Sequence, residues 1–262
     1  MASWYDLRVF CTEGLGGNPL AVFTEPVEDM RATAAAIGYS ETVFLGGEPS
    51  SRAGVRTARI FTPEGEIPFA GHPIVGAAWL FEELAGNPVN RLVVPYGEIE
   101  AWRVGDRAYL RSEPPEVGGA SDDPFSVVEA LRADPADLTP RLPIARCGHG
   151  ARWTFVPFAE PQRVLELEPD FDMVKGVAEV GLYCFAMRGD EVTSRCFAPS
   201  VGIAEDPGTG SAALALMAYL ARFSRRSPSE LTVNQTECRI DVSMNERGIV
   251  IGGEVVLDGV RS

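Results

Sequence analysis

The sequence is poor in histidine and in lysine. Among 262 residues there are two histidines and a single lysine, Lys175, and the net charge is −14. A protein this acidic, without a run of Lys or Arg, repels the phosphates of nucleic acids and the anionic lipids of a membrane surface. Two histidines are also too few for a histidine-rich metal site. The composition therefore argues against nucleic-acid binding, membrane docking and such a metal site.

Long hydrophobic runs and paired cysteines are missing as well. No apolar stretch approaches the roughly 20 residues that a membrane helix needs, and the first residues show no basic n-region or apolar h-region of an export signal. The five cysteines lack Cys-x-x-Cys spacing, which argues against a disulfide framework or a thiolate zinc site and favours small buried side chains. We therefore expect a cytoplasmic protein without a bound metal.

The sequence does contain the material of a globular fold. Hydrophobic residues make up 45 % and charged residues 23 %, and the length suits two domains of about 130 residues or one large α/β domain. Local patterns predict strands over residues 5–11, 19–24, 42–45, 56–61, 153–158 and 183–187, helices over 28–37 and 169–177, and a loop over 193–197. A segment rich in Pro, Asp and Gly, residues 113–140, is the expected domain boundary.

Two predicted helices, residues 73–83 and 211–222, are apolar on nearly every side, so each should be buried. Arg59-Ile60-Phe61-Thr62-Pro63 reappears 136 residues later as Arg195-Cys196-Phe197-Ala198-Pro199. With one inserted residue Gly71 falls on Gly208, just before each helix. The sequence therefore predicts an α+β fold of two pseudo-symmetric halves, each an antiparallel β-barrel-like sheet around a central buried helix. The halves are residues 1–118 and 119–262, and the last strand is expected to pack back on the first half.

Polar motifs open both buried helices. The first is Ala70-Gly71-His72-Pro73 and the second is Glu205-Asp206-Pro207-Gly208-Thr209-Gly210-Ser211. Unpaired N–H groups at a helix start, with glycines that allow close approach, suit a carboxylate ligand. If the halves pack about a pseudo-twofold axis, both helix starts would face one cleft.

Three residues of these segments could exchange protons. His72 and Asp206 are acid–base groups beside the helix starts, and partial desolvation would raise the pKa of Glu41 toward neutrality. Each also has a simpler interpretation: Glu41 as a surface charge, and His72, Asp206 and Ser211 as helix caps. The loop after Asp206 lacks the Gly-Lys-Ser/Thr ending of a nucleotide-binding loop.

Five motifs together resemble the PhzF family of phenazine-biosynthesis-like isomerases. They are Gly16-Gly17-Asn18-Pro19-Leu20-Ala21-Val22-Phe23, Ser40-Glu41-Thr42, Arg59-Ile60-Phe61-Thr62-Pro63, Ala70-Gly71-His72-Pro73 and Glu205-Asp206-Pro207-Gly208-Thr209-Gly210-Ser211-Ala212. They occur in family order over nearly the whole chain. The resemblance implies the two-domain fold of diaminopimelate epimerase, a homodimer, and no cofactor.

The resemblance also implies roles for individual residues. Glu41 would take a proton from one ring carbon and return it to another, while His72 and Asp206 would position the substrate and assist proton delivery. These three are the expected catalytic residues. The expected substrate-binding residues are Asn18, Gly71, Gly208, Thr209, Gly210 and Ser211.

Racemases of the same fold use two cysteines, one before each helix. Ala70 and Pro207 stand at those positions here, and neither exchanges a proton, so two-thiol racemisation is excluded. The segment Gln235-Thr236-Glu237-Cys238-Arg239 lacks the glycines of the family's Gln-Gly turn and Gly-Arg pair. Arg152 would either clamp a second substrate carboxylate or lie on the surface.

The expected function is that of a cofactor-independent isomerase of secondary metabolism. It would move a proton and a double bond in a small unsaturated, carboxylated, amino acid-like substrate, similar to trans-2,3-dihydro-3-hydroxyanthranilate isomerase. Three alternatives stay open: a PhzF-like isomerase of 4-alkylproline-type antibiotic biosynthesis, a one-base epimerase, and a non-catalytic small-molecule binding protein.

Overall fold

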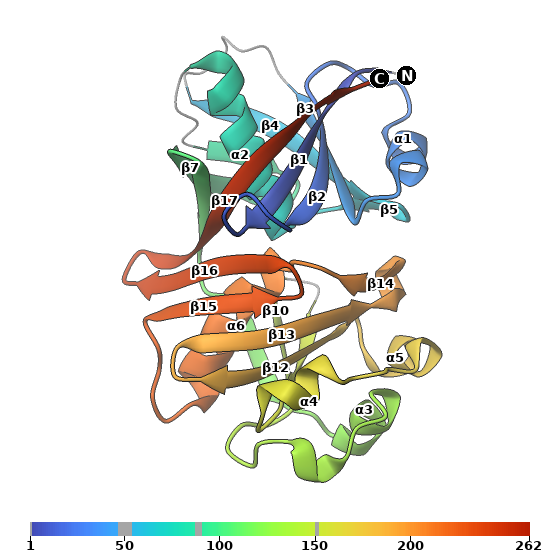
Figure 1. Cartoon of the computed structure of the whole chain (residues 1–262), viewed down its shortest axis with the longest axis vertical. Helices are drawn as coiled ribbons and strands as arrows, with labels where there is room; N and C mark the ends of the chain where they lie inside the picture. The colour runs from blue at the N-terminus through green and yellow to red at the C-terminus, as the bar shows by residue number, and fades with distance from the viewer. Residues whose placement is uncertain (1, 47–53, 87–90, 150–151) are drawn as a thin grey trace. The chain divides into compact units, whose positions relative to one another are not determined.

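The structure is a computed structural model that describes residues 2–46, 54–86, 91–149 and 152–262 (Figure 1). The chain forms two compact units. The first comprises Met1–Ser112, Glu237–Arg239 and Val250–Ser262, and the second comprises Glu113–Thr236 and Ile240–Ile249. The boundary expected between residues 118 and 119 lies inside strand β9 (Glu116–Ala120), which pairs with β10 of the second unit. The Gly-rich sequence of β9 has no apolar alternation, and this hid the strand from the sequence analysis.

The first unit is a closed β-barrel with a helix inside it. Its elements are β1 (Trp4–Cys11), β2 (Asn18–Phe23), α1 (Met30–Ile37), β3 (Glu41–Gly46), β4 (Val55–Thr62), β5 (Gly65–Ile67), α2 (Gly71–Ala85), β6 (Arg91–Val94), β7 (Gly97–Val104), β8 (Arg107–Ser112) and most of β17 (Gly248–Arg261). Pairing runs β1–β2–β3–β4–β6–β7–β8–β17 and closes between β17 and β1. The last strand therefore completes the first unit.

Helix α2 lies inside this barrel and contacts strands on several sides, from β1 to β8. Residues 71–80 are all buried, as expected for a helix without a polar face. The barrel wall comes so close that a Cβ on Gly76 would lie 2.4 Å from Leu20 Cδ2 and 2.9 Å from Val9 Cγ2. Only glycine fits this contact without movement of the wall.

The sheet is mixed rather than wholly antiparallel. β2 pairs parallel with β3, and β4 pairs parallel with β6, while β1–β2, β1–β17, β3–β4, β6–β7 and β7–β8 are antiparallel. Parallel neighbours need a crossover connection. Helix α1 lies in the connection between β2 and β3, and α2 lies in that between β4 and β6.

The second unit repeats this plan. Its elements are β9, α3 (Pro124–Ala130), β10 (Ala145–Gly148), β11 (Trp153–Pro157), α4 (Pro161–Leu165), α5 (Phe171–Val177), β12 (Leu182–Arg188), β13 (Glu191–Ala198), β14 (Ile203–Asp206), α6 (Gly210–Phe223), β15 (Glu230–Gln235) and β16 (Cys238–Asn245), with short 3₁₀ turns at Pro135–Asp137 and Pro199–Val201. β11 pairs parallel with β12, and β13 pairs parallel with β15. Helix α6 is buried from Ala212 to Leu220 and contacts β9, β10 and β11.

The prediction of a loop over residues 193–197 is wrong, because these residues form the middle of β13. The polar side chains Thr193 and Arg195 alternate with buried ones in this strand. Arg195 lies against partners that the local sequence does not reveal: its guanidinium donates to the carbonyl of Leu167 at 2.7 Å and pairs with Glu205.

The repeated arginines each pair with a glutamate in both units. Arg59 pairs with Glu66 through two hydrogen bonds, at 2.8 and 2.6 Å. Arg195 pairs with Glu205 in the same way, at 2.8 Å for both bonds. Each pair links the repeated strand to the short strand that follows it, β4 to β5 and β13 to β14. This shared arrangement supports the internal duplication inferred from the sequence.

The two helix starts correct the spacing of the repeat. Helix α2 begins at Gly71 and α6 begins at Gly210, so the structural counterpart of Gly71 is Gly210 rather than Gly208. The 3₁₀ turn Pro199–Val201 lengthens the second unit before its helix. The N-cap residues are Ala70 and Thr209. Neither is a cysteine, so the exclusion of two-thiol racemisation is unaffected.

All five cysteines are buried and unbridged, as expected. Within the part of the chain that the structure describes, no helix is both long and apolar enough to span a membrane. Among the same residues, no group of three or more His, Cys, Asp or Glu side chains is arranged to hold a metal ion.

Candidate functional site

Four polar side chains of the first unit meet at the start of α2. Asn18 is the first residue of β2, Ser40 and Glu41 stand at the start of β3, and His72 lies in the first turn of α2. Asn18, Glu41 and His72 are 1 %, 8 % and 2 % exposed. The parallel pairing of β2 with β3 brings the two strand starts together beside the helix. A group of polar residues this buried is costly unless its members satisfy one another.

Asn18 connects Ser40 to His72. The Ser40 hydroxyl donates to Asn18 Oδ1 at 3.2 Å, and Asn18 Nδ2 lies 3.4 Å from His72 Nδ1. Glu41 Oε2 lies 3.6 Å from the same Nδ1, and Nε2 is buried without a hydrogen-bond partner among the described residues. The cluster therefore places a carboxylate and an amide beside one nitrogen of a buried imidazole.

Burial holds the His72 ring neutral. Desolvation lowers the pKa of His72 from 6.5 to about 3, against a smaller upward contribution from the carbonyl of Pro19. An ionised Glu41 nearby favours a protonated ring, but loss of water from a fully enclosed imidazole opposes it more strongly. At neutral pH His72 is thus a hydrogen-bonding group without a charge.

The second unit has its own polar cluster, at the start of α6. Asp206 ends β14, Thr209 is the N-cap of α6, and Gln235 ends β15. Asp206 and Thr209 are each 4 % exposed and Gln235 is fully buried. The Thr209 hydroxyl donates to Asp206 Oδ2 at 2.7 Å, and Gln235 bonds to both residues. Gly208 N donates to Asp206 Oδ1 at 3.5 Å, a long contact.

Ser211 follows these residues in the first turn of α6. Its Oγ accepts a hydrogen bond from Trp153 Nε1 at 3.2 Å. An indole nitrogen is only a donor, so the hydroxyl hydrogen of Ser211 is not used by this contact. Gly210, the first residue of the helix, is buried.

The structure thus groups the predicted site residues by unit. Asn18, Glu41, Gly71 and His72 lie at the start of α2, and Asp206, Gly208, Thr209, Gly210 and Ser211 lie at the start of α6. Their catalytic and binding roles, and the shared cleft, stay predictions. Arg152 pairs with Glu179 at 3.3 Å, and both side chains are more than a third exposed, in line with the surface alternative.

Sequence analysis did not assign Gln235 or Trp153 to the site. Gln235 did leave a signal: Leu231 and Val233 precede it at alternate positions of β15 and are buried, so Gln235 belongs to the same inward face. A glutamine on an inward strand face needs a buried polar partner. Trp153 left no comparable signal, because its contact with Ser211 joins segments far apart in the chain.

The carboxylate of Glu41 has no counterpart in the second unit. The repeated phenylalanines, Phe61 and Phe197, pair with the residues that directly follow Glu41 and Gly181 in the chain. The counterpart of Glu41 is therefore Gly181. A Cβ there would lie 2.3 Å from the carbonyl oxygen of Phe197, so this position admits no side chain. Of the two units, only the first has a carboxylate at this position.

A buried helix enclosed by a β-sheet, present twice, is the architecture of epimerase-type isomerases. The solved structure of a hydroxyproline epimerase from Agrobacterium vitis matches 99 % of this chain and 90 % of its own, with a TM-score of 0.65 at 13 % identity. At that identity the likeness is one of fold alone. A PhzF-family protein from Bacillus anthracis matches more closely in fold, with a TM-score of 0.83 at 20 % identity over 99 % and 98 % of the two chains.

A family model and relatives of higher sequence identity show which family the chain belongs to. The family model for phenazine biosynthesis-like proteins matches residues 7–241. The trans-2,3-dihydro-3-hydroxyanthranilate isomerase of Pseudomonas fluorescens is 31 % identical over 236 residues, which cover 86 % of this chain and 82 % of that protein. A predicted epimerase from Pseudomonas aeruginosa, 26 % identical, has a TM-score of 0.85 and matches 100 % and 99 % of the two chains. The chain belongs to the PhzF family of phenazine biosynthesis-like proteins, and it is an isomerase.

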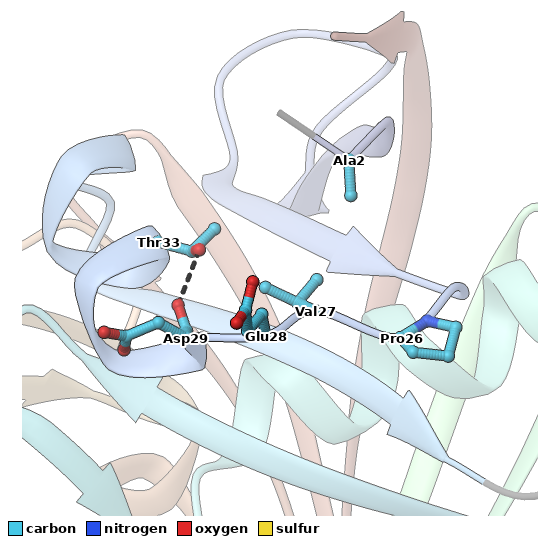
Figure 2. A pocket seen from close by; sticks show the side chains of 6 residues that line it. All are labelled: Ala2, Pro26, Val27, Glu28, Asp29 and Thr33. Carbon is cyan, nitrogen blue, oxygen red and sulfur yellow. Dashed lines mark hydrogen bonds between the residues drawn. The ribbon is translucent and has the colours of Figure 1, made fainter.

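A separate hollow of about 710 Å³ lies on the first unit (Figure 2). Its lining includes Ala2, Pro26, Val27, Glu28, Asp29 and Thr33. The Asp29 side chain accepts from Ala32 N, and the Thr33 hydroxyl donates to the Asp29 carbonyl at 2.7 Å. These polar groups serve to begin helix α1. None of the predicted site residues is among these described lining residues.

Proposed function

We propose that the protein is a cofactor-independent isomerase that moves a proton, and with it a double bond, within a small unsaturated carboxylated substrate. Glu41 is the acid–base group in this proposal. The observation that carries it is a carboxylate 8 % exposed and 3.6 Å from a buried imidazole. The missing counterpart at Gly181 supports a single base that both removes and returns the proton.

The proposed reaction needs no change of oxidation state. Glu41 removes a proton from an sp³ carbon next to a double bond, and the electron pair that remains is delocalised over the conjugated system. Glu41 then returns the proton to another carbon of that system, which shifts the double bond and restores the carboxylate. Burial of the base excludes water that would compete for the proton.

In this proposal the remaining polar groups position the substrate and bind its charged and polar groups. His72 acts as a hydrogen-bonding group without a charge, since burial lowers its pKa to about 3. Asp206 is proposed to position the substrate and to assist proton delivery by Glu41. The backbone at Gly71, Gly208, Thr209 and Gly210, with the side chains of Asn18 and Ser211, binds the substrate carboxylate and its polar substituents.

Family membership supports the proposed substrate class. Relatives from Pseudomonas fluorescens and Pseudomonas chlororaphis, 31 % and 32 % identical, are named trans-2,3-dihydro-3-hydroxyanthranilate isomerases. We propose an amino acid-like substrate of this kind in secondary metabolism. We further propose that the protein acts in the cytoplasm as a homodimer, without a cofactor and without nucleic-acid or membrane partners.

The test is turnover in deuterated water with trans-2,3-dihydro-3-hydroxyanthranilate and a panel of pyrroline dienes. A shift in ultraviolet absorbance together with a changed C–H label supports double-bond migration. Glu41→Gln should lower kcat by about 10²–10⁴-fold, the usual contribution of a general base. Glu98→Gln is the matched control, because this glutamate of the same unit pairs with Arg91 on the surface.

Other outcomes separate the alternatives. Exchange at Cα without an absorbance change indicates a one-base epimerase. Tight binding of these compounds without turnover indicates a binding protein. Full turnover by Glu41→Gln contradicts the assignment of the base.

A further inference from the structure

The side chains of Gln235, Thr209 and Asp206 form more hydrogen bonds with one another than the capping of helix α6 requires. Gln235 Nε2 donates to the Asp206 carbonyl at 2.7 Å and to Thr209 Oγ1 at 2.9 Å. Gln235 Oε1 accepts from Thr209 N at 3.2 Å. The glutamine thereby holds both ends of the loop between β14 and α6 while it is itself fully buried.

The orientation of the Gln235 amide is fixed by these partners. If the amide were turned over, Oε1 would face the Asp206 carbonyl, and two acceptors would meet. Nε2 would then face the N–H of Thr209, and two donors would meet. Only one orientation satisfies every group, in contrast to most amide side chains.

This orientation sets the direction of the next hydrogen bond. Since Thr209 Oγ1 accepts from Gln235 Nε2, its single hydrogen is free to point at Asp206 Oδ2, 2.7 Å away. Asp206 Oδ2 is therefore an acceptor for as long as the network is intact.

We propose that Gln235 is a positioning residue, which acts through Thr209 to keep Asp206 Oδ2 as the acceptor of the Thr209 hydroxyl. This inference rests on the proposed role of Asp206 in assisting proton delivery.

Titratable side chains on the neighbouring strands also lie near Asp206, and Cys196 is hydrogen-bonded to the Thr209 side chain. Burial raises the pKa of Cys196 on β13 well above its usual value and also raises the pKa of Tyr183 on β12. Both therefore stay neutral at ordinary pH. Glu205, the neighbour of Asp206 on β14, is paired with Arg195. The hydroxyl of Thr209 is the neutral donor whose removal most directly alters the carboxylate.

The experiment compares Thr209→Val, Thr209→Ser and Gln235→Met with the wild type in the isomerase assay. Thr209→Val keeps the shape of the side chain but removes the donor, so kcat should fall about 10–100-fold with a smaller change in KM. The limb of the pH profile that belongs to Asp206 should move upward by on the order of one pH unit, the worth of one hydrogen bond to a charged group. Thr209→Ser should restore both.

Two controls separate folding from positioning. Thr154→Val makes the same change at a buried threonine of the same unit whose hydroxyl has no hydrogen-bond partner among the described residues, and it should leave kcat unchanged. Urea unfolding of every variant shows whether the second unit is intact. If Gln235→Met does not fold, the comparison of Thr209→Val with Thr209→Ser carries the test alone.

Asp206→Asn separates this inference from the proposed function. Full activity of Asp206→Asn would overturn the role of Asp206 and with it the proposal on which the inference rests. Impaired Asp206→Asn with wild-type rates and an unmoved pH profile for Thr209→Val would overturn the positioning role of Gln235 alone.

Discussion

The low pKa of His72 predicts both the direction and the size of a change in unfolding free energy with pH. Burial lowers the pKa of His72 from 6.5 to about 3, whereas the unfolded chain has the ordinary value. Between these two pH values the unfolded state binds a proton that the folded state does not. The stabilising effect of keeping the ring neutral is therefore complete above pH 6.5 and is lost progressively as the pH falls toward 3.

The size follows from the free energy of protonation, which changes by about 1.4 kcal/mol when a pKa changes by one. At pH 5 the wild type should have lost about 2 kcal/mol of unfolding free energy through this group, and about 4–5 kcal/mol below pH 3. His72→Asn removes the titrating ring, so the difference between wild type and variant should change by these amounts between pH 7.5 and low pH. The prediction concerns only how this difference changes with pH, so the absolute stability of the variant does not affect it.

Urea unfolding followed by tryptophan fluorescence measures the difference. Trp4, Trp79 and Trp102 belong to the first unit, so fluorescence reports mainly on the unit that contains His72. His149→Asn is a comparison in the second unit: burial lowers the pKa of His149 as well, so the wild type should lose stability relative to this variant in the same direction as the pH falls. A wild type that gains stability over His72→Asn as the pH falls would refute the reasoning, since it would show that attraction to Glu41 outweighs desolvation.

Three further predictions concern single contacts. Trp153→Phe removes the hydrogen-bond donor to Ser211. KM in the isomerase assay should then rise about 3–10-fold with less change in kcat, as expected for the loss of one hydrogen bond. An unchanged KM would count against Ser211 as a substrate-binding residue. Gly76→Ala should lower the free energy of unfolding in urea by about 2–3 kcal/mol, because the new Cβ meets the barrel wall. Gly176→Ala in α5 is the control: no atom lies within 4 Å of its new Cβ, so the free energy of unfolding should rise by roughly 0.5–1 kcal/mol. Equal effects of the two substitutions would contradict the packing argument. Thr236→Gly should raise stability by about 1 kcal/mol because it relieves a positive φ, and a loss would show that the threonine side chain matters more.

The parts of the fold that the sequence predicts are those with local causes. Helices α2 and α6 are apolar on every side, so their burial follows from composition alone. The repeated arginine motif predicts the duplication because each copy builds the same strand and ion pair. The site residues at the helix starts follow from the motifs that precede those helices.

The parts that the sequence misses have distant causes. Residues 193–197 look like a loop because Arg195 is satisfied by Leu167 and Glu205 rather than by its neighbours. β9 is strand because it pairs with β10, not because of its own side chains. Gln235 gains its importance from the loop between β14 and α6, which no local pattern places beside it.

The central claim is that Glu41 alone removes and returns the proton. It is tested most directly with substrate deuterated at the carbon that loses its proton, in a single turnover in ordinary water. The account predicts that the wild-type product carries part of the label at the carbon that gains the proton, and that Glu41→Gln gives neither product nor label transfer. Label transfer by Glu41→Gln at the wild-type rate would contradict it.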